Sequence, residues 1–366
     1  MNEKEMTSNP RPEIISVECN LEEFPFTCVA LKNLKKLKEY HYERWIKDYS
    51  TNKSLKQEWT MIAAPNNHLP GPFDLDVKRA LDKIVFQTGI ENVVQVRKIS
   101  FSIYQIVEIL GLKMGGTTYK NIKESLERLH ATRYTSKNAF FLKNTKQYVG
   151  DSFFLIERLN MKEAIDASST RTKVTVYFGS YYLESLKSYY VKPFDFGFYL
   201  SLKNPIRKRL YGILDKRSFS SKTIIYDLIE LGKVIPLSNR SPSKIRQVIT
   251  PSFEELKRRG YLSDFNFYTE NKVHIIEIKV RGTNPKKTKL SEEDQFFVDE
   301  IIRQTGDSNS QSKKYYEKVC KTVDRNLIYR ALSEVKEEDH LGEIKKSKGA
   351  LFTTKIKRYL KEMQNH

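Results

Sequence analysis

The stretch Ile103–Leu110 (IYQIVEIL) is echoed later in the chain by Ile225–Leu231 (IYDLIEL). Each copy is followed by a polar turn and then by a basic helical stretch, over residues 118–129 in the first case and 243–256 in the second. Each basic stretch leads into a pair of strand-like runs. An internal repeat indicates an architecture before any single motif does. Helix, turn, basic helix and β-ribbon, used twice, predict two tandem winged-helix domains.

The chain is strongly basic. It has 366 residues and a formal net charge of +19, which favours a polyanionic partner such as DNA, RNA or an anionic membrane surface. A merely soluble basic protein is the alternative. No apolar run approaches the ~18 residues that would span a bilayer, so we expect no membrane partner. Three scattered cysteines and six separated histidines indicate neither a disulfide framework nor a structural zinc site, which fits a cytoplasmic protein.

The pattern of apolar residues and of glycine and proline predicts an α+β chain in five parts. We expect an N-terminal arm over 1–24, a first winged-helix domain with added N-terminal strands over 25–160, a linker over 161–172, a second winged-helix domain over 173–281, and a helical C-terminal region over 282–366. The first wing is expected around residues 143–151 and the second around the turn 269–272.

The two basic stretches carry the residue types that read base edges in a major groove. Arg and Lys suit guanine, whereas Asn and Gln suit adenine, and the N-terminal residues of a recognition helix make these contacts. The DNA-binding residues expected on the first helix are Thr118, Lys120, Asn121 and Lys123. Those expected on or near the second helix are Arg240, Ser243, Lys244, Arg246 and Gln247, with Lys272 in the second wing.

A second basic cluster lies upstream of the second repeat. Residues 203–222 hold seven basic residues and one acidic residue. We expect Lys203, Arg207, Lys208 and Arg209 to contact phosphates, which gives affinity without sequence information. The alternative is that these cations belong to a solvated helix face.

An enzymatic reading rests on Asp264 and the Glu277–Lys279 segment, which match the Asp…Glu-x-Lys arrangement of metal-dependent nucleases, where carboxylates hold Mg²⁺. These residues also fall on the strands needed for the second wing. The chain has no His-x-His pair of the kind found in nicking enzymes and no GxxxxGK[ST] phosphate loop. We therefore expect no catalytic residues, no metal and no cofactor, and keep a nuclease as a minor alternative.

The chain resembles plasmid replication initiators of the tandem winged-helix type, in particular the replication initiator protein A family. The resemblance rests on several segments in order: Phe73–Asp76 with the helix after it, the helix-turn-helix over 103–130, Asn204–Tyr211, Ile249–Leu256 followed by Gly260–Leu262, and Lys345–Phe352.

The resemblance implies a non-enzymatic bacterial initiator that binds repeated double-stranded sites at a plasmid origin, with each winged helix in one of two successive major grooves. It also implies that binding helps to open a neighbouring AT-rich segment and recruits a host initiator or replicative helicase, and that a homodimer represses the protein's own gene while monomers initiate. A winged-helix transcriptional regulator is the alternative. The sequence hardly distinguishes it from an initiator, because both bind duplex sites.

Overall fold

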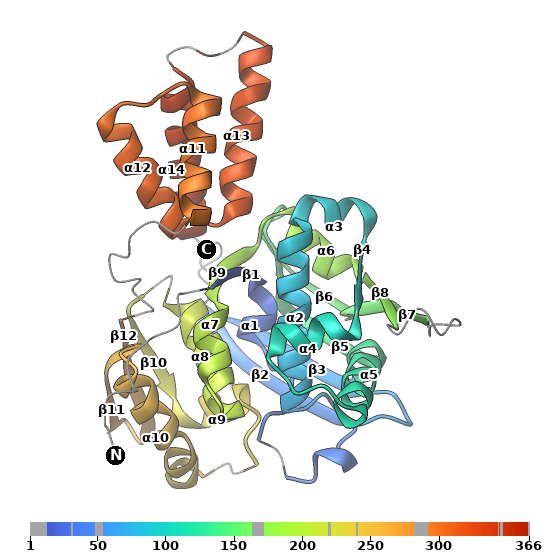
Figure 1. The fold of residues 1–366 in the computed structure, drawn as a ribbon. Helices are drawn as coiled ribbons and strands as arrows, with labels where there is room; N and C mark the ends of the chain where they lie inside the picture. The colour runs from blue at the N-terminus through green and yellow to red at the C-terminus, as the bar shows by residue number, and fades with distance from the viewer. Residues whose placement is uncertain are drawn as a thin grey trace, which may run out of the picture. The chain divides into compact units, whose positions relative to one another are not determined.

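The computed structural model describes residues 13–30, 32–47, 54–162, 172–218, 221–238, 241–281, 292–342, 344 and 347–364. The chain divides into two compact units, Met1–Thr283 and Asn284–His366. Both winged helices lie in the first unit, and the second unit is helical throughout its described part (Figure 1).

The first winged helix has three helices and three strands. They are α2 (Pro72–Thr88), β4 (Lys98–Ser102), α4 (Ile103–Leu110), α5 (Gly116–Ala131), β7 (Ile156–Lys162) and β8 (Lys173–Phe178). The strands form an antiparallel sheet in the order β4-β8-β7. Ser102 caps α4 by accepting a hydrogen bond from the Gln105 N–H at 3.2 Å, and Gly111 ends the helix with a φ of 61°. A residue without a Cβ adopts this left-handed conformation at little cost, so the chain turns sharply into α5.

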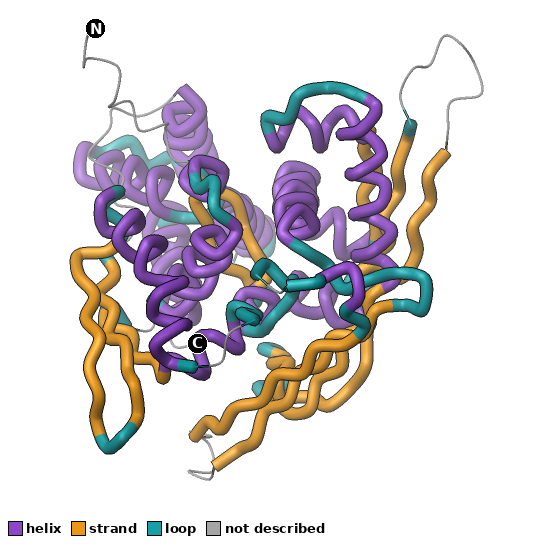
Figure 2. Tube along the Cα trace, turned by 90° about the horizontal axis from the view of Figure 1, so that it is seen from below, coloured by secondary structure: helices purple, strands orange, loops and turns teal. Residues whose placement is uncertain are grey.

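The second winged helix repeats this order of elements. They are α8 (Pro205–Arg217), β10 (Thr223–Asp227), α9 (Leu228–Val234), α10 (Pro242–Arg258), β11 (Leu262–Glu270) and β12 (Val273–Val280). The sheet order β10-β12-β11 matches β4-β8-β7. The β11–β12 ribbon lies at the left edge of Figure 2, with its two strands joined by a tight turn. The tandem winged-helix fold predicted from the repeat is therefore confirmed.

The register of the sequence repeat differs from the expected one by three residues. Helix α4 begins at Ile103, whereas Ile225 still belongs to strand β10 and α9 begins at Leu228. The Asp227 carboxylate accepts hydrogen bonds from the Ile229 and Glu230 N–H groups at 2.6 and 3.0 Å. The two capping residues, Ser102 and Asp227, are therefore the structural equivalents, because the cap fixes where each helix starts.

A four-stranded antiparallel sheet is added to the first winged helix, with two strands that precede α2 and two that lie between α5 and β7 in the chain. Its strands, in the order β2-β3-β5-β6, are β2 (Glu39–Lys47), β3 (Ser54–Ala63), β5 (Thr132–Leu142) and β6 (Gln147–Phe154). The buried ring of Phe153 packs edge-on against both Trp59 and Phe140 on the inner face of the sheet. Burial of this aromatic area stabilises the added sheet.

The expected position of the first wing is wrong. The ribbon around 143–151 is the β5–β6 hairpin, which extends the sheet of the N-terminal strands because β5 pairs with β3. The ribbon of the first winged helix is β7–β8, and β8 (Lys173–Phe178) pairs with β4 rather than beginning the second winged helix. Most of the expected linker, residues 163–171, lies between these two strands and outside the described residues.

The remaining elements of the first unit tie its parts together. Strand β1 (Ile14–Glu18) pairs with β9 (Val191–Asp195), so these residues of the expected arm are ordered, while residues 1–12 lie outside the described part. The β-branched segment Val93–Val96 is typical of a strand in sequence but belongs to helix α3 (Ile90–Val96). The short helices are α1 (Cys19–Glu23), η1 (Leu34–Lys36), α3 (Ile90–Val96), α6 (Ser180–Lys187) and α7 (Phe196–Ser201).

The second unit has its own hydrophobic core. Its helices are α11 (Glu292–Thr305), α12 (Ser310–Thr322), α13 (Arg325–His340) and α14 (Lys348–Gln364). Ile301, Ile328 and Phe352 are fully buried. A Cβ atom at Gly349 would clash with the Asp307 side chain, so the start of α14 and the α11–α12 loop approach more closely than a side chain would allow.

Candidate nucleic-acid interface

Helices α5 and α10 are packed in the same way. The buried positions of α5 are Ile122, Ser125, Leu126 and Leu129, and those at the matching spacing of α10 are Ile249, Ser252, Phe253 and Leu256. Apolar residues at i, i+4 and i+7 place one face of a helix on the core, and the serine in each set lets the helix approach closely. The opposite face of each helix is left to solvent.

The exposed face of α10 carries four of the predicted residues. Ser243, Lys244, Arg246 and Gln247 are all exposed, whereas Ile245 between them is buried at 1% exposure. Ile245 fixes the start of the helix, since a Cβ atom at Gly232 in α9 would lie only 2.8 Å from its Cδ1. The Arg246 guanidinium lies 4.6 Å from the centre of the Phe267 ring in β11. Arg240 lies outside the described residues.

Helix α5 offers a less uniform surface. Lys120 and Asn121 are exposed, and Thr118 and Lys123 are half-buried. The Thr118 hydroxyl donates a hydrogen bond to the Lys113 carbonyl at 2.9 Å, and the Lys123 Nζ lies 5.3 Å from the centre of the Tyr119 ring. Lys120 has a side chain that is 75% exposed and only a long contact of 3.9 Å with Glu124, so its charge is available to a ligand.

The second wing brings Lys272 to the tip of the β11–β12 ribbon. Asn271 and Lys272 both have positive φ, 49° and 67°, which is typical of the two-residue turns that join twisted strands. Lys272 is exposed. The wing and the N-terminal half of α10 thus belong to one compact module, linked by the contact between Arg246 and Phe267.

The phosphate contact expected for Arg209 is wrong. The surroundings of Lys208 and Arg207 also differ from the solvent-exposed positions that a phosphate contact requires. Arg209 is 2% exposed, and its guanidinium donates hydrogen bonds to the backbone carbonyls of Glu22 and Phe24 at 3.1 and 2.7 Å. Burial lowers the pKa of this guanidinium to about 10. Lys208 is paired with Asp76 at 2.7 Å. Side chains held inside the protein in this way are not presented to a phosphate.

The other two members of that cluster, Arg207 and Lys203, differ in how far their side chains are exposed. Arg207 is half-buried, and its nearest carboxylate contact is Glu255 at 3.9 Å. Lys203 is exposed, just before Asn204, whose side chain caps α8 by accepting from the N–H groups of residues 206 and 207. Of the four residues in this cluster, Lys203 alone is exposed.

A buried ionic cluster, which we define as Glu22, Lys78, Arg79 and Asp82, was not expected from the sequence. All four side chains are at most 2% exposed. Arg79 pairs with Glu22 and, at 3.2 Å, with Asp82, and Lys78 pairs with Asp82 at 2.8 Å. Burial alone would raise the pKa of Glu22, but the charges of Arg79 and Lys78 lower it well below its ordinary value.

This buried ionic cluster lies where the two winged helices meet. Glu22 belongs to α1, Arg79 belongs to α2 of the first winged helix, and a Cβ atom at Gly212 in α8 of the second would lie 2.5 Å from Glu22. Lys208 of α8 also reaches Asp76 of α2. Since an unpaired buried charge is costly, these contacts hold α2 and α8 in one arrangement. The charged residues of α2 resemble a solvated face in sequence, so no periodicity signal could have found them.

The residues of the nuclease-like pattern are engaged on the second wing. Asp264 accepts a hydrogen bond from Lys257 at 2.7 Å, and Lys279 lies 3.5 Å from Glu277. Among the residues that the structure describes, no three His, Cys, Asp or Glu side chains form a group that could hold a metal ion.

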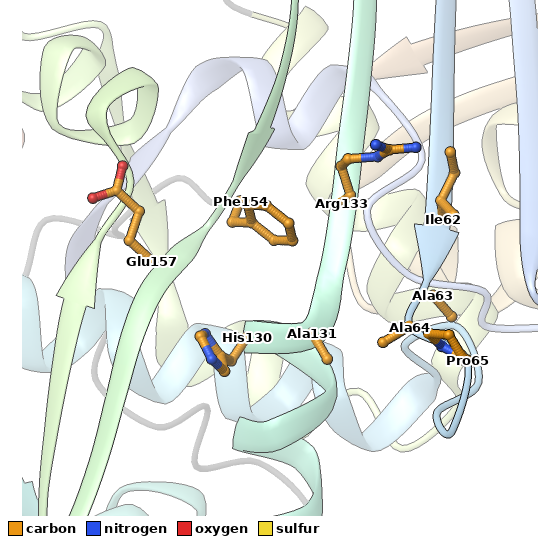
Figure 3. A pocket seen from close by; sticks show the side chains of 9 residues that line it. All are labelled: Ile62, Ala63, Ala64, Pro65, His130, Ala131, Arg133, Phe154 and Glu157. Carbon is orange, nitrogen blue, oxygen red and sulfur yellow. The ribbon is translucent and has the colours of Figure 1, made fainter.

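An open pocket of about 490 Å³ lies beside the end of α5 (Figure 3). Its lining includes His130, Arg133, Phe154 and Glu157. The His130 ring nitrogen is 2.9 Å from the Ile156 carbonyl, and Glu157 accepts a hydrogen bond from the Ser180 N–H at 3.1 Å. Both of these polar groups therefore already support the local fold.

Over the described ranges, no helix combines the length and the apolar character that crossing a bilayer requires.

Comparisons with known proteins give one family and several similar structures. A family model described as replication initiator protein A matches residues 34–245, which is more than half of the chain. Similar solved structures include domains 2 and 3 of RctB, with 15% identity, a TM-score of 0.44, and coverage of 69% of this chain and 94% of that chain. The Pi initiator protein in complex with iteron DNA has 16% identity, a TM-score of 0.40, and coverage of 56% and 90% respectively. No curated protein matches the chain.

Proposed function

The chain belongs to the replication initiator protein A family, and from that premise we propose that it is a sequence-specific, double-stranded DNA-binding initiator that acts at the repeats of a plasmid origin. It acts by binding and not by catalysis, and it needs no cofactor or metal. The observation that carries the proposal is the pair of equivalently packed helices, α5 and α10, whose polar faces are left to solvent.

In this proposal each of these helices enters a major groove. Arg246 and Gln247 of α10 and Asn121 of α5 are the residue types that read base edges through paired hydrogen bonds. Lys120, Lys244, Lys203 and Lys272 supply phosphate contacts, with Thr118, Lys123 and Ser243 as shorter-range contacts beside them. Because the buried ionic cluster joins the two modules, docking of one raises the effective concentration of the other at its own half-site.

We further propose that binding promotes origin opening. Deformation of duplex DNA stores elastic energy that a neighbouring AT-rich segment releases on melting. A host initiator or replicative helicase would then be recruited, and a homodimer of the chain would act at its own promoter. The protein would work in the bacterial cytoplasm, on the plasmid or nucleoid.

A footprint of the purified full chain on the DNA that flanks its own gene tests the DNA-binding part. We expect protection of direct repeats, at a protein concentration far below that needed on unrelated DNA of the same length. Equal affinity for both DNAs would contradict sequence-specific binding.

A replication assay separates an initiator from a transcriptional regulator with the same modules. We expect a plasmid that carries only the repeat region to replicate when the gene is supplied in trans. A protein that occupies the repeats but leaves this plasmid unreplicated would be a regulator.

A further inference from the structure

The outer face of the sheet β4-β8-β7 has an unusual composition. Alternate residues of a strand point to opposite faces, and Ile99, Phe101, Val174, Val176 and Phe178 occupy the buried face. The outer face therefore carries Lys98, Ser100 and Ser102 from β4, Lys173, Thr175 and Tyr177 from β8, and Arg158, Asn160 and Lys162 from β7. Four of these residues are basic, none is acidic, and the others can form hydrogen bonds. The exposed Glu157, which is the extra residue of the bulge between Ile156 and Arg158, pairs with Arg97 at 3.7 Å and accepts a hydrogen bond from the Ser180 N–H.

The four cations of this outer face lack carboxylate partners. Across the described parts of the chain, no acidic side chain forms an ion pair with Lys98, Arg158, Lys162 or Lys173. Lys162 and Lys173 are direct cross-strand partners, and like charges placed opposite each other destabilise a sheet. Lys98 is half-buried, and the other three residues are exposed. The repulsion would be relieved by a bound polyanion.

Two other sheet faces of the same molecule serve as internal comparisons. On the sheet β2-β3-β5-β6, Lys56 pairs with Glu43 and Glu58, and Lys137 pairs with Glu58 at 3.0 Å. The equivalent outer face of the second winged helix holds Asp227, Asp264, Glu270 and Glu277 against the single cation Lys279. The unneutralised charge is therefore a property of the first winged helix and does not follow from the fold or from the overall basicity of the chain.

An aromatic ring lies among these cations. The Arg158 guanidinium is 3.9 Å from the centre of the Tyr177 ring, and the Lys98 Nζ is 5.6 Å from it. Tyr177 is the cross-strand partner of both residues. A flat guanidinium held over an aromatic ring is a platform on which a nucleobase can stack, and flanking cations follow the backbone of the strand. A duplex keeps the faces of its bases stacked inside, so it would leave this platform unused.

We propose that the outer face of β4-β8-β7 binds single-stranded DNA, as a second nucleic-acid site separate from the duplex-reading helices α5 and α10. Arg158 and Tyr177 take a base, and Lys98, Lys162 and Lys173 contact phosphates. The site goes beyond the proposed duplex function and does not require it. On an initiator, it would let the chain hold one strand of a melted segment while α10 keeps its duplex contacts.

The test measures the affinity of the full chain for a fluorescein-labelled 20-mer of thymidylate by fluorescence anisotropy. We expect Arg158→Gln and Tyr177→Leu each to weaken binding about tenfold, as removal of one stacking partner does, and Tyr177→Phe to retain it. The pair Lys162→Gln with Lys173→Gln should lower the salt slope by about 0.7 for each phosphate that is no longer neutralised. Lys279→Gln, on the outer face of the second sheet, and Lys56→Gln, on the sheet β2-β3-β5-β6, are the matched controls and should change neither quantity.

A labelled GC-rich hairpin and the Arg246→Ala variant complete the design. Face variants that leave binding of the 20-mer unchanged would overturn the proposal, as would variants that weaken hairpin binding equally, which would make the face a duplex surface. A loss of 20-mer binding in Arg246→Ala as large as in Arg158→Gln would assign the strand to α10 instead. The full chain could fail to protect the repeats while its binding of the 20-mer still depends on Arg158 and Tyr177. That result would contradict the initiator function and support the single-strand site. Thermal unfolding midpoints equal to that of the parent chain establish that the variants are folded.

Discussion

The guanidinium of Arg246 lies 4.6 Å from the centre of the Phe267 ring, so a residue of the recognition helix is held by a strand of the wing. Phe267 in turn packs edge-on against Phe265, and Phe265 packs against Phe253 on the buried side of α10. This row of rings connects the core to an exposed arginine. A cation held over a ring loses less conformational freedom when it binds.

Arg246→Ala is expected to relax base preference at one position of the DNA site, at a cost of ~1–3 kcal/mol on the preferred sequence. The reason is that a bidentate arginine contact discriminates guanine from other bases. Binding to a set of sites with single base changes measures this. If Arg246→Ala instead weakens binding by the same factor on every sequence, Arg246 contacts phosphate.

Phe267→Leu provides the control for that result. It keeps an apolar side chain on β11 but removes the ring beneath the guanidinium. We expect a smaller loss of discrimination at the same base position, with Phe267→Tyr close to the parent chain. A change at a different base position would show that Phe267 does not act through Arg246.

Lys208→Ala is expected to lower the free energy of unfolding while leaving the salt dependence of DNA binding unchanged. Lys208 pairs with Asp76 across the two winged helices at 2.7 Å, with a side chain that is only 13% exposed. Loss of a pair in this setting costs ~1–3 kcal/mol. Lys203→Ala, at an exposed position just before α8, should give the opposite result, with unchanged stability and a flatter salt slope. Urea unfolding and binding titrations at several salt concentrations distinguish the two outcomes.

Asp195→Asn is expected to stabilise the protein at pH 7 to 8 by ~1–2 kcal/mol. Burial raises the pKa of Asp195 from 3.8 to about 6, so between these values the folded state binds the proton more strongly than the unfolded state does. Stability from this group therefore falls as the pH rises through that window. The amide keeps an oxygen that can accept from the Phe198 N–H, as Asp195 does at 2.8 Å.

Thermal unfolding of the parent chain and of Asp195→Asn from pH 4 to pH 8 measures this effect. The stabilisation should shrink towards pH 4, where the carboxyl is increasingly protonated in both states. Asp227→Asn is the matched control, since Asp227 also caps a helix but is half-buried. A gain for Asp195→Asn that is equal at both ends of the range would contradict the raised pKa.

Glu22→Gln is expected to destabilise the first unit by ~3 kcal/mol, because it removes one of the two carboxylates, Glu22 and Asp82, that pair with the buried Arg79. Glu39→Gln, on an exposed part of β2, should cost almost nothing. Hydrogen exchange resolved along the chain would detect the loss in α2 and α8, with α11 to α14 unaffected. Protection that falls equally in both units would contradict a local role for Glu22.

Local signals predicted much of the fold. Gly111 ends α4, Asn204 caps α8 and Pro242 begins α10, and the i, i+4, i+7 spacing of Ile122, Leu126 and Leu129 predicts the buried face of α5. The position of the first wing does not follow from local sequence, because the β5–β6 hairpin and the β7–β8 ribbon have similar strand patterns. Which strand each one pairs with depends on long-range burial, and the aromatic core around Trp59 decides it.

In the candidate site, the positive charge of a residue does not predict whether its side chain is free to contact DNA. Arg207, Lys208 and Arg209 are adjacent and look equivalent in the sequence, yet one is half-buried, one is paired with Asp76, and one is enclosed among backbone carbonyls. Conversely, the cations on the outer face of β4-β8-β7 are scattered along the chain and gather only when three strands pair.

The pairing of β1 with β9 has a consequence for how the polypeptide is made. Residues 14–18 find their partner only after residues 191–195 have left the ribosome. At ordinary rates of translation this is a wait of about 10–40 s. During that time Glu22 has not yet been enclosed by α8, and the positive charges of α2 lack part of their final surroundings. Chaperones and proteases therefore have their best access to the nascent chain before residue 195 emerges, and shortened products that stop in this interval should be cleared rather than accumulate.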